Sequence, residues 1–326
     1  MIRKEWNRIG ICICGILLFL IPAFSFAEEF PTKPINVLVA YAPGGIVDIS
    51  IRILAGKAEK FLGQPFLISN NGGGAGSVAT GIVAKQKPDG YHLLGGASTS
   101  LIRVPQFRDV PYKPEHFVPV MHYGSPLSGV AVKADSPWKI LKELVEYARK
   151  NPGKVTYSTS GAGGPHHLSM EFVAKQEGIQ WTHIPYQGGT PGLMALLGGH
   201  VTANVSSSWI IYSKEGSVRA LATHGEKRSK AFPNVPTFRE AGYDFINETV
   251  FLFAAPRGTP PSIIKKLDDA FRKAMDEIEF IQGMERLEID VDYRNSADTG
   301  RYLEEAYVRL GKMIADLKIP REVEKK

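Results

Sequence analysis

One pattern of apolar and polar positions recurs four times along the chain: a short apolar run, a glycine-containing turn and a segment with helical periodicity. Short apolar runs bounded by turn residues are typical of buried strands, and apolar positions three and four residues apart are typical of amphipathic helices. The apolar runs of the four units lie at 35–40, 66–68, 154–158 and 180–184. The pattern predicts an α/β protein with open sheets.

The turns of these four units carry the candidate chemistry. They cover 41–45, 70–77, 159–167 and 185–190. Open α/β sheets hold their ligands at loops that leave the carboxyl ends of strands. Glycine lets the backbone approach a ligand closely, and the first turn of a helix offers N–H groups and the positive end of its dipole. We therefore expect a carboxylate or phosphate site, although any one of these turns alone is equally well a simple strand-to-helix turn.

Further apolar runs and helical patterns complete the expected elements. Strands are predicted at 91–96, 120–132, 201–206, 218–223 and 249–255, and helices at 138–150, 262–278 and 296–317. Ser136 is the expected N-cap of the first of these helices. The segment 97–100 is expected to be a polar loop whose hydroxyls donate to a ligand, and 103–119 is expected to be irregular. The length suffices for two domains of ordinary size.

The first 27 residues have the three parts of a secretory signal peptide. Three basic residues precede an apolar segment at 9–21 that is too short to span a membrane comfortably, and Ser25-Phe26-Ala27 is a small-x-small cleavage site. An uncleaved anchor is the alternative. Both cysteines, Cys12 and Cys14, lie in this segment, so cleavage after Ala27 leaves 299 of the 326 residues without a cysteine. Thiol chemistry and disulfides are then not expected.

Charge and motifs narrow the function classes. The net charge of +6 falls to +4 without the signal peptide, which suits an anionic ligand, and no aromatic-interleaved basic stripe of a nucleic-acid binder is present. No lysine follows the glycines as in a P-loop, and no Gly-x-Ser-x-Gly elbow occurs. Gly74-x-Gly76-x-x-Ala79 fits a dinucleotide fingerprint but leaves three turns unexplained. The pair His166-His167 has no carboxylate at ligand spacing, so neither a metal nor a cofactor is expected.

Short motifs spread over nearly the whole of 28–326 form one ordered set. They are Pro31-Thr32-Lys33-Pro34-Ile35, Pro43-Gly44-Gly45-Ile46-Val47-Asp48 with Arg52, Leu62-Gly63-Gln64, Gly74-Ala75-Gly76, Pro88-Asp89-Gly90-Tyr91, Ser160-Gly161-Ala162-Gly163 with His167-Leu168, Pro185-Tyr186, Ala195-Leu196-Leu197-Gly198-Gly199, Pro233-Asn234-Val235-Pro236-Thr237 with Glu240-Ala241-Gly242, and Ala255-Pro256-Arg257-Gly258-Thr259-Pro260. Each is weak alone, but the order and spacing are specific. In this set the chain resembles the Bug-type (TctC-like) substrate-binding proteins of tripartite tricarboxylate transporters.

The resemblance implies a type II periplasmic binding protein fold, in which two α/β lobes close on a ligand in a central cleft. Lobe 1 is expected at 28–130 and 249–326, and lobe 2 at 131–248. Such a protein is a periplasmic, monomeric receptor without catalytic residues. It delivers a small carboxylate to integral membrane transporter subunits. The family holds a carboxylate through backbone groups and ordered waters at the turn Pro43-Gly44-Gly45.

The turns, the hydroxyl cluster and the resemblance together indicate one set of ligand-binding residues. These are Tyr41, Pro43, Gly44, Gly45, Asp48, Gly74, Ala75, Gly76, Ser77, Ser98, Thr99, Ser160, Gly161, His167, Tyr186, Thr190 and Thr202. Asp48 has a second interpretation, as a residue that caps its helix or orders the first loop, and so has His167, as a residue that holds its own loop.

The chain departs from the family pattern at three places. Gly72-Gly73 stand where the family usually has Arg-Pro or Lys-Pro, Gly164 replaces a serine, and Thr202 replaces an aspartate found in many members. Without that aspartate a ligand ammonium group is not expected. Because no arginine lies in the matched loops, the carboxylate is expected to be held mainly by backbone N–H groups, hydroxyls and water.

Two other functions stay open at this point. An exported hydrolase would use Ser160 and His167, and a sensing subunit would present the same closed fold to a membrane kinase. Citrate-like acids, dicarboxylates, aromatic acids and nicotinate-like rings all stay open as ligands. The shape of the cleft depends on side chains such as Phe107, Trp209 and Phe251, whose directions the sequence does not reveal.

Overall fold

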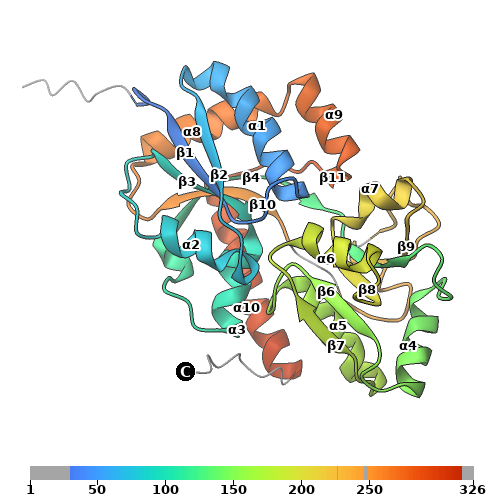
Figure 1. Ribbon diagram of the computed structural model, residues 1–326. Coiled ribbons are helices and arrows are strands. Elements are labelled where there is room, and N and C mark those ends of the chain that lie inside the picture. Colours follow the sequence, from blue (N-terminus) through green and yellow to red (C-terminus); the bar gives the residue numbers. More distant parts are fainter. Residues whose placement is uncertain (1–29, 226, 246–248, 318–326) are drawn as a thin grey trace, which may run out of the picture.

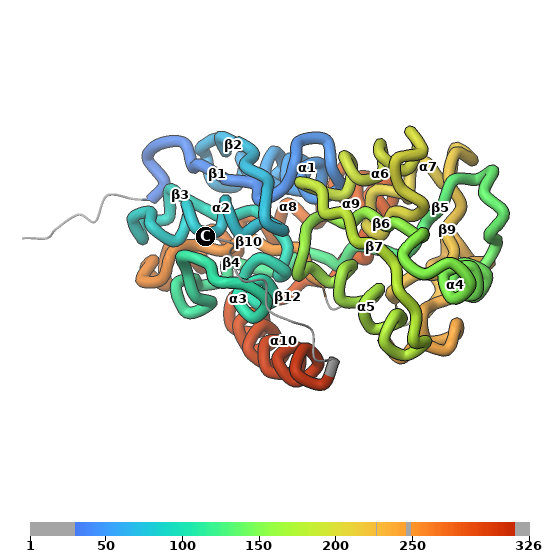
Figure 2. The backbone as a smooth tube through the Cα atoms, turned by 60° about the horizontal axis from the view of Figure 1, so that its bottom comes forward, coloured from blue at the N-terminus to red at the C-terminus, as the bar shows by residue number. Residues whose placement is uncertain are grey.

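The computed structural model describes residues 30–225, 227–245 and 249–317, and the strands in them form two separate sheets. The first contains β1 (Ile35–Val39), β2 (Phe66–Asn70), β3 (His92–Ala97), β4 (Phe117–Pro126), β10 (Phe251–Pro256), β11 (Ile289–Asp290) and β12 (Arg294–Asn295). The second contains β5 (Gly129–Lys133), β6 (Thr156–Thr159), β7 (Thr182–Pro185), β8 (Ala203–Ser206) and β9 (Val218–Thr223). Figures 1 and 2 show the two sheets, each with its own helices, as two lobes side by side. The two-lobed α/β fold is confirmed.

The first sheet has the order β11-β4-β10-β3-β1-β2, and β12 also pairs with β4. β1 runs parallel to β2 and β3, whereas β10 runs antiparallel to β3 and β4. One face is covered by α1 (Ile46–Leu62), α8 (Pro261–Ala274) and α9 (Ile278–Arg286), and the other by α2 (Ser77–Val83) and α10 (Ser296–Leu317). The apolar run of β10 is buried between these layers along its whole length, which explains its lack of polar alternation, whereas β1 buries every second residue.

The second sheet has the order β7-β6-β8-β5-β9. β6 runs parallel to β7 and β8, and β5 runs antiparallel to β8 and β9. α4 (Leu141–Lys150) and α5 (Pro165–Glu177) pack on one face, and α6 (Gly189–Leu197) and α7 (Trp209–Lys214) pack on the other. Each lobe is therefore a sheet between two helical layers, with parallel strands whose carboxyl ends lead into the glycine turns.

The chain crosses between the sheets twice, from β4 to β5 and from β9 to β10. The expected boundary at 130/131 falls inside β5, and the one at 248/249 precedes β10; the assignment of lobes by these residues stays a prediction. Phe107 from α3 (Val104–Phe107) and Ile314 from α10 pack into the core of the second lobe. Elements attached to the first sheet thus support the second lobe as well, and Figure 1 shows α10 extending toward it.

Several element boundaries differ from the expectation. The Arg219 guanidinium donates hydrogen bonds to the carbonyls of Ala134, Ser136 and Trp138. These bonds hold the segment in a non-helical conformation, so α4 begins only at Leu141. Ser136 therefore caps no helix. A π-helical turn at Thr99–Arg103 replaces the expected polar loop, and α3 and β4 occupy part of the segment expected to be irregular. The helix expected at 262–278 ends at Ala274 as α8, and α9 follows as a separate helix from Ile278. No helix in the three described ranges is both long and apolar enough to span a membrane.

Candidate functional site

A cavity of about 50 Å³ lies between the two sheets, beyond the carboxyl ends of β1, β3, β6 and β8. Its lining consists of Tyr41, Ala42, Gly45, Ile46, Val47, Ala97, Thr99, Pro126, Ser160, Pro165, His166, Gly188, Gly189, Thr190, Ser206, Ser207, Ser208, Thr249 and Phe251. None of these described lining residues is acidic, and many carry hydroxyl groups. This is the position at which open α/β sheets hold their ligands.

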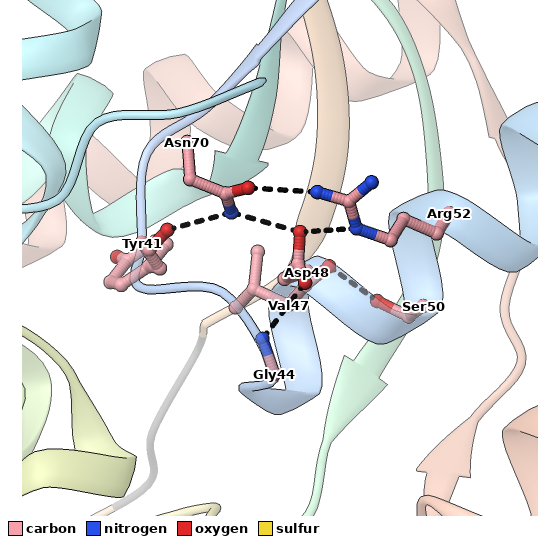
Figure 3. Close-up of polar contacts among 7 residues, drawn as sticks. All are labelled: Tyr41, Gly44, Val47, Asp48, Ser50, Arg52 and Asn70. Atoms are coloured by element: carbon pink, nitrogen blue, oxygen red, sulfur yellow. Dashed lines mark hydrogen bonds and ion pairs between the residues drawn. The ribbon is translucent and has the colours of Figure 1, made fainter. Parts of the chain in front are cut away.

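The turn between β1 and α1 is held from behind by the carboxylate of Asp48 (Figure 3). Its Oδ2 accepts the N–H of Gly44 at 2.9 Å, and its Oδ1 accepts Nε of Arg52 at 2.9 Å. Gly44 has φ of +75°, a left-handed conformation that glycine adopts without strain. Asp48 lies outside the cavity lining, so its contacts match the second interpretation, in which it orders the turn.

Asn70, at the end of β2, ties this turn to the neighbouring strand (Figure 3). Its Nδ2 donates to the Tyr41 carbonyl at 3.0 Å and to Asp48 Oδ1 at 2.8 Å. Its Oδ1 accepts Nη2 of Arg52 at 2.8 Å, which closes the network. The sequence analysis did not select Asn70 as a site residue, although it is the first residue of the second turn, 70–77. The network fixes the backbone that carries Tyr41 at the cavity wall.

The glycine turn after β2 contacts the other lobe and does not line the cavity. Gly74, Ala75 and Gly76 all have positive φ, with Ala75 at +56°. A Cβ atom at Gly161, in the turn after β6, would lie 2.7 Å from the backbone nitrogen of Ala75. Glycine at 161 therefore allows the two turns to meet. Ser77 begins α2 and also lies outside the lining.

Further contacts join the lobes around the cavity. Arg108 Nη2, just after α3, donates to the Ala162 carbonyl at 2.9 Å. On another side, Lys214 Nζ at the end of α7 lies 2.6 Å from Glu288 Oε1, which follows α9. These contacts connect elements of the two sheets, so the lobes touch each other near the cavity.

Adjacent histidines at the start of α5 have different surroundings. His167 Nδ1 accepts the N–H of Gly163 at 3.2 Å, and its ring stacks on His183 with 4.1 Å between centroids. Burial and the charge of Arg108 lower the pKa of His167 to about 4. Its contacts are those of a residue that holds its loop. The cavity is lined by His166 instead, which the sequence analysis did not select.

This arrangement contradicts the hydrolase alternative. Ser160 lines the cavity, whereas the ring nitrogens of His167 face the Gly163 N–H and, at 3.9 Å, the Glu171 carboxylate. Within the described ranges no hydrogen bond joins Ser160 to His167. The low pKa of His167 also makes it a weak base at neutral pH. The two residues do not form a nucleophile and its base.

A buried arginine lies behind the cavity, although none was expected near the matched loops. Arg103 ends the π-helical turn and is 1 % exposed. Burial raises the pKa of Tyr41 and lowers the pKa values of His166 and His224, and the Arg103 charge lowers all three. One positive charge therefore acts on two cavity-lining side chains without lining the cavity itself.

Five of the expected ligand-binding residues line the cavity, namely Tyr41, Gly45, Thr99, Ser160 and Thr190. They come from both lobes, and the structure brings them together around one space. Pro43, Gly44 and Asp48 belong to the turn behind this lining, and Gly74, Ala75, Gly76, Ser77, Gly161 and His167 belong to the contacts described above.

The remaining three expected residues have other surroundings. The Ser98 hydroxyl accepts the Val250 N–H at 3.2 Å, which pins β3 to the segment before β10. Tyr186 packs against the core under α6 and α7. Thr202 lies at the amino end of β8, with its hydroxyl 3.3 Å from that of Thr156, so it is at the opposite end of the strand from the cavity.

Fourteen lining residues were not selected as ligand-binding residues from the sequence. The run Ser206-Ser207-Ser208 begins at the last residue of β8, so the rule that selected the other turns also applies to it. Phe251 was expected only as a side chain that shapes the cleft, and it does line the cavity. The others are Ala42, Ile46, Val47, Ala97, Pro126, Pro165, His166, Gly188, Gly189 and Thr249.

Comparison with known proteins extends these observations. A family model described as "Tripartite tricarboxylate transporter family receptor" matches residues 50–319. A Cupriavidus necator protein named "UPF0065 protein in gbd 5'region" is 37% identical over 302 residues, which cover 91% of this chain and 92% of that protein.

Solved structures agree with this assignment. The periplasmic binding protein BugD is 26% identical with a TM-score of 0.84, covering 90% of this chain and 100% of that one. A Rhodopseudomonas palustris protein with bound malate is 28% identical with a TM-score of 0.81, covering 87% and 100%. A protein of R. palustris with adipate is 26% identical with a TM-score of 0.84, covering 90% and 99%. The chain is therefore a solute-binding receptor of the periplasmic type and not an enzyme, and it belongs to the tripartite tricarboxylate transporter receptor (TctC) family.

Proposed function

We propose that this receptor binds a small organic carboxylate in the cavity between its lobes and delivers it to the integral membrane subunits of a tripartite tricarboxylate-type transporter. The observation that carries the proposal is the N-terminus of α1 at the cavity wall, where Gly45, Ile46 and Val47 are part of the lining. N–H groups in a first helical turn have no carbonyl partner within the helix, and the helix dipole adds positive potential there. A carboxylate is stabilised at such a place without a charged side chain.

The chemistry of the remaining lining supports the same ligand class. The hydroxyls of Thr99, Ser160 and Thr190 can donate hydrogen bonds to carboxylate oxygens, and no acidic side chain of the described lining would repel them. The structural neighbours named with malate and adipate hold carboxylates in the same fold. Both observations favour an organic acid over a cationic or purely apolar ligand.

Closure of the lobes explains how such a receptor holds its ligand. The cavity of about 50 Å³ has room for roughly four water-sized positions and has walls from both lobes, so a ligand there lies between the lobes. Entry and release therefore require the lobes to separate at the two chain crossings, as in hinge closure generally. A ligand that contacts both lobes stabilises the closed state, because only that state offers both sets of contacts.

Export and assembly complete the proposal. The basic and apolar N-terminal segment with Ser25-Phe26-Ala27 supports cleavage after Ala27 and release into the periplasm. The mature receptor would act as a monomer, since one chain supplies both walls of the cavity. N-terminal sequencing of protein from the periplasmic fraction tests the cleavage site, and light scattering tests the monomer.

A thermal-unfolding panel on ligand-stripped protein tests the carboxylate proposal. Residues 28–326 are unfolded, freed of bound small molecules, refolded and heated with malate, adipate, citrate, nicotinate or benzoate. A ligand at a hundred times its Kd adds about 2.7 kcal/mol to the free energy of unfolding. That addition raises Tm by a few degrees. Failure of every acid in the panel to raise Tm, with a neutral solute raising it instead, would contradict the carboxylate assignment.

Uptake measurements test the transport step separately. The acid that raises Tm most is supplied in radiolabelled form to cells with and without the gene. Transport predicts that uptake is lost with the gene and restored by a plasmid copy. Unchanged uptake together with loss of induction by that acid would assign the receptor to sensing instead.

A further inference from the structure

One pair of residues in the sequence has a chemistry that the receptor function does not use. Asn71-Gly72 is the only asparagine followed by a glycine in the chain. The peptide nitrogen after an asparagine can attack the side-chain carbonyl, which makes asparagine a thermolabile residue. Glycine has no Cβ atom to hinder that attack. Gly72 is also one of the two glycines by which this chain departs from the family pattern, so the pair arises from that departure.

The reacting groups of this pair are free to meet. The Asn71 side chain and the Gly72 N–H make no hydrogen bond to any residue of the described ranges, and both residues are partly exposed. They lie between the end of β2 at Asn70 and the short helical turn Gly74–Gly76, so no helix or strand fixes the peptide plane between them. The rotation that brings Cγ of Asn71 to the Gly72 nitrogen therefore breaks no hydrogen bond.

The neighbouring asparagine, Asn70, is protected at both reacting groups. Its side chain makes the three hydrogen bonds of the network around the first turn. The N–H that follows it, that of Asn71, donates to the Val39 carbonyl at 2.9 Å. Asn295 is protected in another way, because its Oδ1 accepts the N–H of Asp298 at 2.9 Å at the start of α10. Of these three asparagines, Asn71 alone has both groups free.

We propose that Asn71 converts to aspartate and isoaspartate without an enzyme, and that the product places a new negative charge between the lobes. The Gly72 nitrogen gives up its proton and attacks Cγ of Asn71. The new C–N bond forms, the bond from Cγ to Nδ2 breaks, and ammonia leaves with the proton. Water then opens the resulting cyclic imide at either of its carbonyls, giving aspartate or isoaspartate, whose main chain is longer by one carbon. Either product has a carboxyl group that is ionised at neutral pH.

The position of the pair gives this charge a consequence. A Cβ atom at Gly72 would lie 3.4 Å from the backbone nitrogen of Ala42 and 3.4 Å from the carbonyl oxygen of Gln187. Ala42 follows β1 of the first sheet and lines the cavity, and Gln187 follows β7 of the second sheet and precedes Gly188, which also lines it. The reacting bond thus lies where the lobes meet beside the cavity. This consequence rests on the proposed function, because the new carboxylate would repel a carboxylate ligand and weaken its binding.

Peptide mapping of aged receptor tests the modification. The mature receptor, residues 28–326, is incubated at pH 8.5 or pH 6, digested with trypsin and analysed by mass spectrometry with fragmentation that distinguishes aspartate from isoaspartate. Asn71 is expected to gain the mass difference between an amide and an acid, and faster at pH 8.5, because the attacking nitrogen must lose its proton. Asn70, in the same tryptic peptide, should keep its amide. An unmodified Asn71, or equal conversion of Asn70, would overturn the proposal.

Variants assign the reaction to this pair. Gly72→Ala adds a Cβ atom beside the attacking nitrogen, so conversion of Asn71 should slow at least about ten-fold. This variant should fold, because Gly72 is not among the glycines with positive φ and its Cβ would meet no described atom closer than 3.4 Å. Asn71→Gln keeps the amide but needs a larger ring, so no conversion is expected. Gly56→Ala, inside α1, is the matched control and should leave the rate at Asn71 unchanged.

The outcomes separate the modification from its effect on binding. Anion exchange isolates the converted receptor, and calorimetry compares it with fresh receptor for whichever of malate, adipate, citrate, nicotinate or benzoate raises Tm most. Binding of that acid should be about two- to five-fold weaker, the range that exposed charge pairs contribute. Equal conversion in Gly72→Ala and the wild type would overturn the modification site, and equal affinity of converted and fresh receptor would overturn its effect. Failure of every acid to bind would contradict the proposed function, while the mass measurement would still decide the modification.

Discussion

At the scale of single residues, the cavity is organised by groups that do not line it. Asp48 and Asn70 hold the turn that carries Tyr41, and burial together with the charge of Arg103 keeps His166 neutral by lowering its pKa. Hydrogen bonds to a charged carboxylate are stronger than hydrogen bonds between neutral groups. Replacing the carboxylate by a group that cannot accept leaves its donors unpaired, which costs the most free energy. Substitutions behind the cavity wall should therefore affect ligand binding.

Asp48→Asn should destabilise the protein by about 1–3 kcal/mol, because an amide NH₂ would then face donors that now meet a carboxylate oxygen. Ligand affinity should fall as well, since the turn at Gly44 loses its anchor. The control is Asp269→Asn, which also breaks an i,i+4 ion pair, with Lys265, but at an exposed site. It should cost no more than about 0.5 kcal/mol in urea unfolding. Equal costs for the two variants would show that the Asp48 network is not structural.

Gly44→Ala and Gly56→Ala should change stability in opposite directions. A Cβ atom at either position meets nothing within 4 Å, so sterics do not distinguish them. Gly44 has φ of +75°, where alanine costs about 1–2 kcal/mol. Gly56 lies inside α1, where alanine gains about 0.5–1 kcal/mol. Thermal unfolding of both variants checks the signs, and a stabilised Gly44→Ala would contradict the described turn.

At the scale of elements, the glycine turns divide into two kinds. Those after β1 and β7 lead into α1 and α6 and line the cavity, whereas the turn after β2 meets the turn after β6 across the lobes. The turn after β6 combines the two features, because Ser160 lines the cavity and the adjacent Gly161 meets the other lobe. A residue that lines the cavity and a residue that contacts the other lobe are thus neighbours in the sequence.

Gly161→Ala should impair closure without unfolding either lobe. Its Cβ would lie 2.7 Å from the Ala75 backbone nitrogen, which belongs to the other lobe and cannot move as a side chain can. Ligand affinity should fall at least about ten-fold, since the closed state is destabilised by more than about 1.4 kcal/mol. Small-angle scattering should then show the variant more extended than the wild type in saturating ligand.

Gly178→Ala provides the control for this substitution. Gly178 also has positive φ, at the end of α5, but a Cβ there meets nothing within 4 Å. It should lose stability from backbone strain alone and keep its ligand affinity. If both variants lose affinity equally, the contact between the turns does not control closure.

The sequence predicted the strands and the turns around the cavity better than the individual contacts. Turns that follow parallel strands must meet at one sheet edge, so the four glycine turns could be placed from the pattern alone. The pattern does not predict which side chain of a turn points toward the cavity. His166 and His167 are about 100° apart around the same first helical turn, and the sequence does not set the rotation of that helix.

Two other misses have equally local causes. Arg103 was overlooked because the segment 103–119 was expected to be irregular, whereas Arg103 ends a π-helical turn, Thr99–Arg103, and is buried. Thr202 was selected from the family pattern, but β8 runs so that its amino end carries Thr202 and its carboxyl end carries Ser206. Strand direction relative to the cleft decides this, and it depends on the whole sheet.

At the scale of the whole molecule, the two lobes bury several histidines in a neutral state. Burial lowers the pKa values of His122 and His167 to about 4 and those of His166 and His183 to about 3, and it lowers that of His224 as well. The unfolded chain binds these protons near pH 6.5, but the folded chain does so only at much lower pH. The stability that depends on them is complete above about pH 6.5 and is lost as the pH falls toward 4.

Acidification from pH 7 to pH 5 should therefore lower the free energy of unfolding, by up to about 2 kcal/mol for each such histidine. Asp268 acts with the opposite sign, because burial raises its pKa to about 6 and its carboxyl is better accommodated when protonated. The contribution of Asp268 is outweighed by those of the five histidines with lowered pKa values. Urea unfolding at the two pH values measures the difference, and equal or greater stability at pH 5 would contradict the neutral burial of these histidines.

The account as a whole depends on recognition of a carboxylate by the N-terminus of α1. The most direct measurement is calorimetric titration of ligand-stripped protein, at pH 7, with an organic acid that raises its Tm and with the corresponding neutral amide. The account predicts one site per chain for the acid and at least about ten-fold weaker binding of the amide, because the charge that the helix end stabilises is gone. Equal affinity for the acid and the amide would contradict it.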